Sequence, residues 1–133
     1  MSNKLNSVLF IDDDMMSNLN SKRIIEKAIE VNEILLAESG LEALDLLKKK
    51  FIPAGKFPEL IFLDIYMPHL NGWEMLGLFK ELGLPAKTKI ILLSASDDDD
   101  DRHRASKIPE VAGYKIKPLT EEYILDLIHN LSA

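Results

Sequence analysis

The chain has 133 residues, of which 47% are hydrophobic and 29% are charged, so we expect one domain with a single core and no room for a second. The net charge of -6 argues against direct DNA binding, because neutralising phosphates requires clustered Lys and Arg, and the lysines at residues 48–50 suit the end of a helix instead. The absence of cysteine excludes disulfides and thiolate metal sites. The apolar runs are only about five residues long, which argues against a membrane span. Together with the lack of a signal segment, this predicts a cytoplasmic protein.

The first half of the chain alternates short apolar runs with helical patterns. We predict, in order, a strand at residues 7–11, a helix at 15–30, a strand at 33–37, a helix to about residue 50, a connection at 51–58 and a strand at 60–63. The expected buried side of the first helix consists of apolar residues at helical spacing, namely Met16, Leu19, Ile24 and Ala28. Ser39, followed three residues later by a glutamate, is the expected cap of the second helix.

The second half of the chain continues the same alternation. We predict a helix at residues 72–82, a strand at 89–93, a strand at 113–116 and a last helix from a Thr120 cap to about residue 131. Residues 98–108 contain few apolar side chains, so the fourth helix has the weakest signal. The alternation predicts an α/β fold with a parallel sheet, in which ligands bind beyond the carboxyl ends of the strands.

Four of the apolar runs end at polar residues suited to phosphate or metal chemistry. Asp12 and Asp13 follow the first run, Asp64 follows LIFL, Ser94 follows KIILL and Lys117 follows GYKI. In a parallel sheet these residues would face one crevice. Carboxylates can hold a cation, a hydroxyl can donate a hydrogen bond and an ammonium can neutralise an anion, so the set predicts a site for a phosphoryl group.

The carboxylates of this site need a counter-charge. Two such charges about 4 Å apart repel by on the order of 4 kcal/mol at an effective dielectric of 20. A divalent cation would remove this repulsion, and oxygen ligands favour magnesium or calcium. Magnesium suits a site that also accepts phosphoryl oxygens, because it retains waters and bridges carboxylate to phosphate. Asp14 is the residue of the acidic run that we expect to cap the first helix.

The motifs FIDDD, LIFLDIYMP, LLSAS and GYKIKP occur in this order, with gaps of 51 residues from Asp13 to Asp64, 30 from Asp64 to Ser94 and 23 from Ser94 to Lys117. From about residue 8 to 131 the chain resembles a response-regulator receiver domain of two-component signalling, of the single-domain, chemotaxis-receiver-like kind. The resemblance implies a five-stranded parallel sheet of flavodoxin-like order 2-1-3-4-5 with helices on both faces.

The resemblance also implies roles at the metal site. Asp64 would be the phospho-acceptor, a nucleophile that takes a phosphoryl group from the phosphohistidine of a sensor histidine kinase or a histidine phosphotransfer protein. Asp13 and Asp64 would bind Mg2+ directly, Asp12 largely through water, and the backbone carbonyl of Tyr66 would supply another ligand.

Three further positions are assigned by the same resemblance. Ser94, the backbone amide near Ala95 and Lys117 would hold the phosphoryl oxygens. The peptide bond between Lys117 and Pro118 is expected to be cis, as is usual in the family. Tyr114, three residues before Lys117, would be the aromatic switch residue, moving together with Ser94, with its ring either outward on the surface or inward.

Two regions depart from the commonest pattern of the family. Tyr66 and Ser96 occupy positions where side chains in the family influence the access of hydrolytic water to the phosphoryl group. We expect the Tyr66 ring to block the path of this water. The acidic run at residues 97–101 is interpreted as a solvated helix start favoured by the helix dipole, with an extra cation site or repulsion of acidic partners as alternatives.

The expected function is that of a response regulator rather than an enzyme, promoting only its own Mg-dependent phosphorylation and dephosphorylation. We expect no output domain after residue 131, so the protein would signal to an unknown downstream protein through a protein-binding face. The alternatives are a phosphorelay intermediate that passes its phosphoryl group to a second histidine protein, a receiver-shaped binding module that does not use phosphorylation, and a magnesium phosphohydrolase. Against the last, Tyr66 occupies the position where such an enzyme has its second aspartate.

Overall fold

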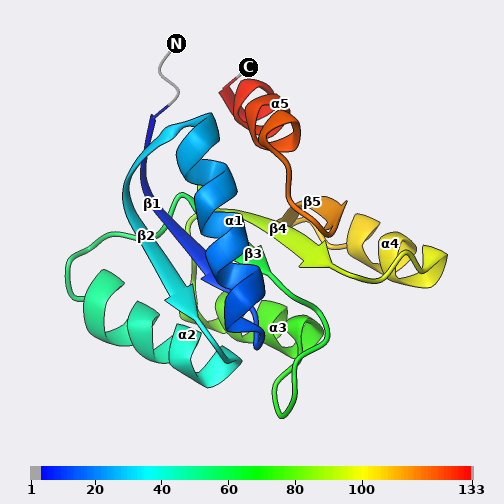
Figure 1. Ribbon diagram of the computed structural model, residues 1–133. Helices are drawn as coiled ribbons and strands as arrows, with labels where there is room; N and C mark the ends of the chain where they lie inside the picture. Colours follow the sequence, from blue (N-terminus) through cyan, green and yellow to red (C-terminus); the bar gives the residue numbers. More distant parts are fainter. Residues whose placement is uncertain (1–3, 133) are drawn as a thin grey trace.

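The structure is a computed structural model that describes residues 4–132. Strands and helices alternate along this part of the chain (Figure 1). Their bounds are β1 Lys4–Ile11, α1 Met15–Ala28, β2 Glu30–Ala37, α2 Gly40–Leu46, the π-helical turn η1 Leu47–Phe51, β3 Leu60–Leu63, α3 Gly72–Leu82, β4 Lys89–Ser94, α4 Asp99–Ser106, β5 Val111–Ile116 and α5 Glu121–Ser132.

The five strands form one parallel sheet in the order β2-β1-β3-β4-β5. This confirms the fold class and the strand order that the sequence motifs implied. Ile11 of β1 pairs with Leu63 of β3, which pairs with Leu92 of β4, so the carboxyl ends of the three central strands lie at nearly the same level. The residues that follow these strands therefore meet at one edge of the sheet.

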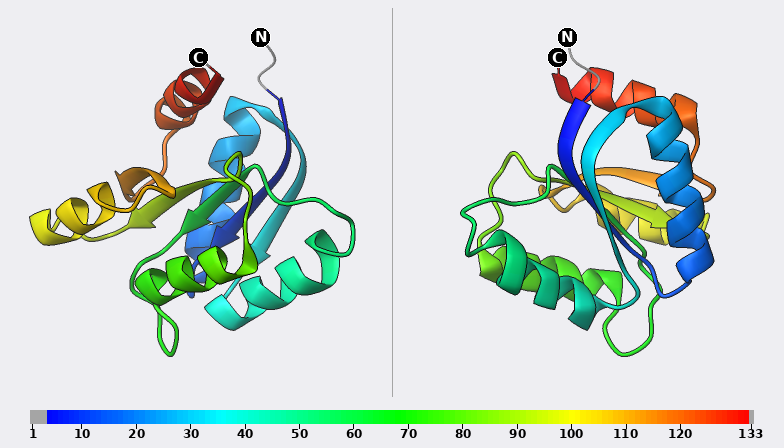
Figure 2. Two further views of the ribbon diagram at one scale, coloured as in Figure 1. Left: turned by 180° about the vertical axis from the view of Figure 1, so that it is seen from behind. Right: turned by 60° about the vertical axis from the view of Figure 1, so that its left-hand side comes forward.

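Helices cover both faces of the sheet, as Figures 1 and 2 show, with α1 and α5 on one face and α2 and α3 on the other. The alternation of side chains along each strand divides the core into two apolar clusters. Leu9 and Leu63 belong to the cluster under α2 and α3, whereas Phe10 and Phe62 belong to the cluster under α1 and α5 and stack with ring centroids 4.8 Å apart. The central strand β3 is buried on both faces.

Side-chain caps define the starts of the helices. The Asp14 carboxylate accepts from the Met16 amide at 3.0 Å, and the Ser39 hydroxyl accepts from the Glu42 amide at 3.1 Å, which confirms both predicted caps. The predicted Thr120 cap is also confirmed, because its hydroxyl accepts from the amide of Tyr123 at 3.1 Å. Each bond satisfies an amide that the first helical turn leaves without a backbone partner.

The first helix differs from its prediction in length and in its buried face. It ends at Ala28, two residues early, because Glu30 already pairs with Lys4 in the sheet, and β1 and β2 both begin three residues before their predicted starts. Met16 is 60% exposed, so its assignment to the core was wrong. The residues of α1 that are buried instead are Asn18, Ser21 and Ile25.

The bounds of β3 and α3 match the predictions, and those of β4, β5 and α5 differ from them by at most two residues. Phe51 belongs to the π-helical turn rather than to the predicted connection, and it is buried in the core. Strand β5 begins at Val111, two residues early, and the weakly signalled fourth helix is present as α4. Within residues 4–132, no helix combines the length and the apolar character that crossing a membrane requires.

Candidate functional site

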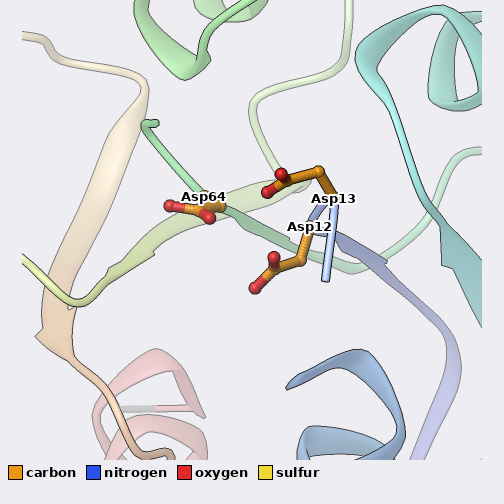
Figure 3. Close-up of side chains that lie close together, drawn as sticks. All are labelled: Asp12, Asp13 and Asp64. Atoms are coloured by element: carbon orange, nitrogen blue, oxygen red, sulfur yellow. The ribbon is translucent and has the colours of Figure 1, made fainter. Parts of the chain in front are cut away.

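Three carboxylates lie together at the carboxyl edge of the sheet (Figure 3). Asp12 and Asp13 follow β1, and Asp64 follows the neighbouring strand β3. One ligand oxygen from each of the three lies within 4.8 Å of the others. Asp12 and Asp64 are buried, whereas Asp13 is exposed. The expected convergence of these residues is therefore present in the fold, and their oxygen-only donor set suits a hard divalent cation.

The turn after β1 is held by polar contacts from α1. The Asp14 amide donates to Asp12 Oδ1 at 2.9 Å. Asn18, which is 2% exposed, donates from Nδ2 to the backbone oxygens of Asp12 and Ala37, at 3.1 and 3.0 Å. The bonds from Asn18 tie the ends of β1 and β2 to the helix, and the bond from the Asp14 amide orients the carboxylate of Asp12.

Lys117, which follows the edge strand β5, contacts two of the carboxylates. Its Nζ lies 2.6 Å from Asp12 Oδ2 and 3.4 Å from Asp64 Oδ2. Its amide donates to the Ser94 backbone oxygen at 2.8 Å, and its peptide bond with Pro118 is cis, as expected. Burial alone would lower the pKa of Lys117, but the hydrogen bond to Asp12 and the charges of Asp64 and Asp12 together raise it.

Asp64 lies in an environment that disfavours its charge. Burial, with a smaller effect from the charge of Asp12, raises the pKa of its carboxyl from 3.8 to about 6 against the opposing charge of Lys117. The Tyr66 amide donates to Asp64 Oδ1 at 3.2 Å, which favours the charged form. One lysine thus does not balance the cluster, and a bound cation would relieve the remaining repulsion.

Ser94 and Ala95 lie at the end of β4, at the same edge of the sheet as this cluster. Ser94 is fully buried, and its Oγ accepts from the Ser96 amide at 3.1 Å. Among residues 4–131, no hydrogen bond joins the Ser94 side chain to Asp64 or Lys117. Ala95 is exposed at the end of β4. Because Oγ only accepts in this bond, the hydroxyl hydrogen of Ser94 remains able to donate to a phosphoryl group.

A second polar group connects the loops beside the cluster. The Tyr114 hydroxyl donates to the Ser96 backbone oxygen at 2.9 Å, and the Tyr114 ring is half-buried. Asp101 Oδ2 accepts from the Tyr66 hydroxyl and, at 3.0 Å, from the Ser96 hydroxyl. The bond from Tyr66 to the charged Asp101 raises the pKa of the phenol.

The acidic run in this region is only partly a solvated helix start. Asp98 caps α4 by accepting from the Asp100 amide at 2.8 Å, and Asp97 pairs with Arg102 at 2.7 Å. Asp101 differs from its neighbours because its carboxylate binds residues of two loops.

The comparisons with known proteins agree with this geometry. Residues 8–129 match the family of response regulator receiver domains. The chain belongs to this family. The crystal structure of a two-component response regulator from Cytophaga hutchinsonii superposes with a TM-score of 0.89 and 37% identity, over 97% of this chain and 98% of that one. The receiver is therefore a module of two-component signalling rather than an enzyme of the usual kind.

Curated relatives of this receiver include longer regulators. The probable transcriptional regulator ycf29 of Porphyra purpurea is 32% identical over 126 residues, which are 95% of this chain and 56% of the relative. The nitrate/nitrite response regulator protein NarL of Escherichia coli is 29% identical over 127 residues, 96% of this chain and 55% of NarL. The chain thus spans about half the length of these two relatives.

Three features of the receiver site escaped the sequence analysis. A Cβ on Gly72 would lie 2.7 Å from the Asp64 backbone oxygen, so glycine allows α3 to begin directly against the end of β3. Asn71 and Glu74 form a complete capping box there, which the spacing N-x-x-E could have indicated. Asn18 and Asp101 act through partners distant in sequence, for which no local pattern exists.

Proposed function

We propose that this receiver accepts a phosphoryl group on Asp64 from the phosphohistidine of a sensor histidine kinase or a histidine phosphotransfer protein. The observation that carries the proposal is the cluster of Asp12, Asp13 and Asp64 with Lys117 set between two of its carboxylates. The same arrangement supports Mg2+ as the cofactor, since all the side-chain donors are oxygens and the site retains excess negative charge.

The proposed transfer forms one bond and breaks another. An oxygen of the Asp64 carboxylate attacks phosphorus, the bond from phosphorus to the donor nitrogen breaks, and the electron pair leaves with the imidazole. Asp13, Asp64 and the backbone carbonyl of Tyr66 would hold Mg2+ directly, and Asp12 would hold it through water. The bound ion would stabilise the charge of the phosphoryl oxygens. Lys117 exchanges its contact with Asp64 for a phosphoryl oxygen while it keeps its bond to Asp12.

The proposed output begins at Ser94. Its hydroxyl leaves the Ser96 amide and, together with the amide near Ala95, donates to the phosphoryl group. Because Tyr114 is bonded to the Ser96 carbonyl, movement of this loop would change the position of the Tyr114 ring. This supports signalling through a protein-binding face around α4 and β5, and the net charge of -6 supports a protein rather than DNA as the partner.

Phosphorylation can be tested with a small donor. Incubation with acetyl phosphate and Mg2+ should add one phosphoryl group to the protein, measured by intact mass, and chelation of the metal should prevent it. Asp64→Asn should abolish labelling, because the amide is a poor nucleophile. Ser94→Ala should still accept the group, since its hydroxyl only stabilises the product.

Asp126→Asn is the matched control, because Asp126 is an exposed carboxylate on α5. Its labelling should equal that of the unchanged protein. Normal Mg-dependent labelling of the Asp64→Asn protein would overturn the assignment. Rapid loss of the group to a second histidine protein, without a change at α4 and β5, would identify a relay intermediate instead of a switch.

A further inference from the structure

Asp101 joins the two loops that carry the acceptor and the buried hydroxyl. It lies in the first turn of α4, and its Oδ2 accepts from two side chains. Tyr66 belongs to the loop after β3, two residues beyond Asp64, and Ser96 belongs to the loop after β4, two residues beyond Ser94. One carboxylate oxygen therefore holds both loops to the same helix.

Tyr66 is held at its backbone and at its hydroxyl. Its backbone amide donates to Asp64 Oδ1 at 3.2 Å, and its hydroxyl donates to Asp101. The residue is 57% exposed, so contacts with the core do little to hold the ring. Without Asp101 the side chain would gain rotational freedom at the surface. The ring thus spans the space between the acceptor loop and α4 because of one polar contact.

Other acidic residues of the same turn do not share this role. Asp99 and Asp100 are exposed and, within the described residues, their carboxylates make no hydrogen bond to either loop. Both lie in the first turn of α4, where the helix dipole favours a negative charge, as it does at Asp101. The dipole therefore explains the acidic run but not the two bonds that Asp101 makes.

We propose that Asp101 is a positioning residue that holds the Tyr66 ring between the loop of Asp64 and α4 and thereby slows the access of water to the phosphoryl group. This inference rests on the proposed phosphorylation of Asp64. In the hydrolysis, a water oxygen bonds to phosphorus and the bond between phosphorus and the Asp64 oxygen breaks. The electron pair stays with the carboxylate, and the protons of the water go to phosphate and solvent. Asp101 touches none of these atoms and acts through Tyr66.

The test compares the rate of phosphoryl loss among variants labelled with acetyl phosphate. Asp101→Ala should speed the loss by about three- to tenfold, the effect expected when one partly exposed hydrogen bond to a charged group is removed. Asp100→Ala removes the same charge from the same turn and should leave the rate unchanged. Tyr66→Phe keeps the ring but loses the bond, so it should match Asp101→Ala. The double variant should be no faster than either single one.

A second measurement separates positioning from the general stability of α4. With 13C-labelled tyrosine, the ring signals of Tyr66 in the unphosphorylated protein should shift and average in Asp101→Ala but not in Asp100→Ala, and Asp101→Asn should restore them in part. Equal ring signals and equal lifetimes in Asp101→Ala and Asp100→Ala would overturn the positioning role. A protein that never accepts phosphate, yet shows the ring change, would overturn the proposed function and leave Asp101 as the residue that orders Tyr66.

Discussion

At the scale of single residues, the charge balance of the site depends on how Asp12 and Asp64 share Lys117. Lys117 lies closer to Asp12 than to Asp64, at 2.6 against 3.4 Å, so Asp64 receives the smaller share of its charge. Burial then outweighs this attraction and raises the pKa of Asp64 to about 6. Asp64 is thus held by its surroundings in a form that gains from a cation or a phosphoryl group.

This imbalance predicts a dependence of stability on pH. Since the pKa of Asp64 is raised from 3.8 to about 6 on folding, its favourable contribution is complete below 3.8 and is lost as the pH rises through about 6. In metal-free buffer, Asp64→Asn should therefore raise the free energy of unfolding at about pH 8 by about 1 to 2 kcal/mol, allowing for screening by solvent. Urea titrations across this pH range measure the difference.

This gain in stability of the Asp64→Asn protein should disappear at about pH 4, because residue 64 is then neutral in the folded state of both proteins. Asp126→Asn, a change of an exposed carboxylate on α5, should show no comparable rise. A loss of stability for Asp64→Asn at neutral pH would mean that attraction to Lys117 outweighs burial, contrary to the raised pKa.

At the scale of elements, α4 is the helix least anchored by apolar contacts. Ala105 is its one residue with a buried side chain. Aromatic residues of neighbouring elements contact its charged side chains instead, since Arg104 lies 4.3 Å from the centroid of the Trp73 ring and Arg102 lies 5.7 Å from that of Tyr114. Such partly exposed contacts are weak, so α4 can shift at a small cost in free energy.

Phosphorylation should therefore act mainly on this part of the molecule. We expect the amide exchange to change chiefly at residues 94–114 and in α5, as measured by mass spectrometry with and without acetyl phosphate. Tyr114→Ala removes the link to the Ser96 carbonyl, so it should abolish the change in α4 while Asp64 still accepts phosphate. Changes confined to the residues around the metal would contradict this coupling.

The elements also show what a sequence can predict about this molecule. The positions of Asp12, Asp64, Ser94 and Lys117 could be predicted because each ends an apolar run, and the ends of parallel strands meet at one edge. The buried face of α1 could be predicted only in part, because Ile24 and Ala28 pack against the core as helical spacing indicated, whereas Met16 does not.

In α1 the helix in fact buries amide and hydroxyl groups, and the Asn18 side chain donates to backbone oxygens of two strands. Long-range partners of this kind have no local signal. For the same reason, the link from Tyr66 to Asp101, 35 residues apart, emerged only from the fold.

At the scale of the whole molecule, the sheet is held by two separate apolar clusters, and the site lies at the end of the strands that divide them. Both clusters include side chains of β1, β3 and β4, the strands that end beside Asp12, Asp64 and Ser94. Core packing thus positions the site without contributing a side chain to it.

A change in this core should lower stability without altering the chemistry. Phe62→Ala removes a ring that is 1% exposed and stacked on Phe10, so it should cost about 3 to 5 kcal/mol in the free energy of unfolding, measured by urea titration. At temperatures where the variant remains folded, Asp64 should still be labelled by acetyl phosphate. Leu41→Ala, at a residue 67% exposed, should change the free energy by less than about 0.5 kcal/mol. A cost for Phe62→Ala as small as that would show that the stacked pair is not part of the core.

The pairing of Ile11 with Leu63 has a consequence for how the gene can change in length. In the connection between η1 and β3, Gly55 takes a positive φ and most side chains are exposed. Insertions and deletions there would leave Asp12 and Asp64 next to each other at the edge of the sheet. A single codon gained within β1 or β3 would turn the following aspartate to the opposite side of the sheet. Related sequences are therefore free to differ in the length of that loop. The number of residues from the middle of β1 to Asp12, or from the middle of β3 to Asp64, is fixed.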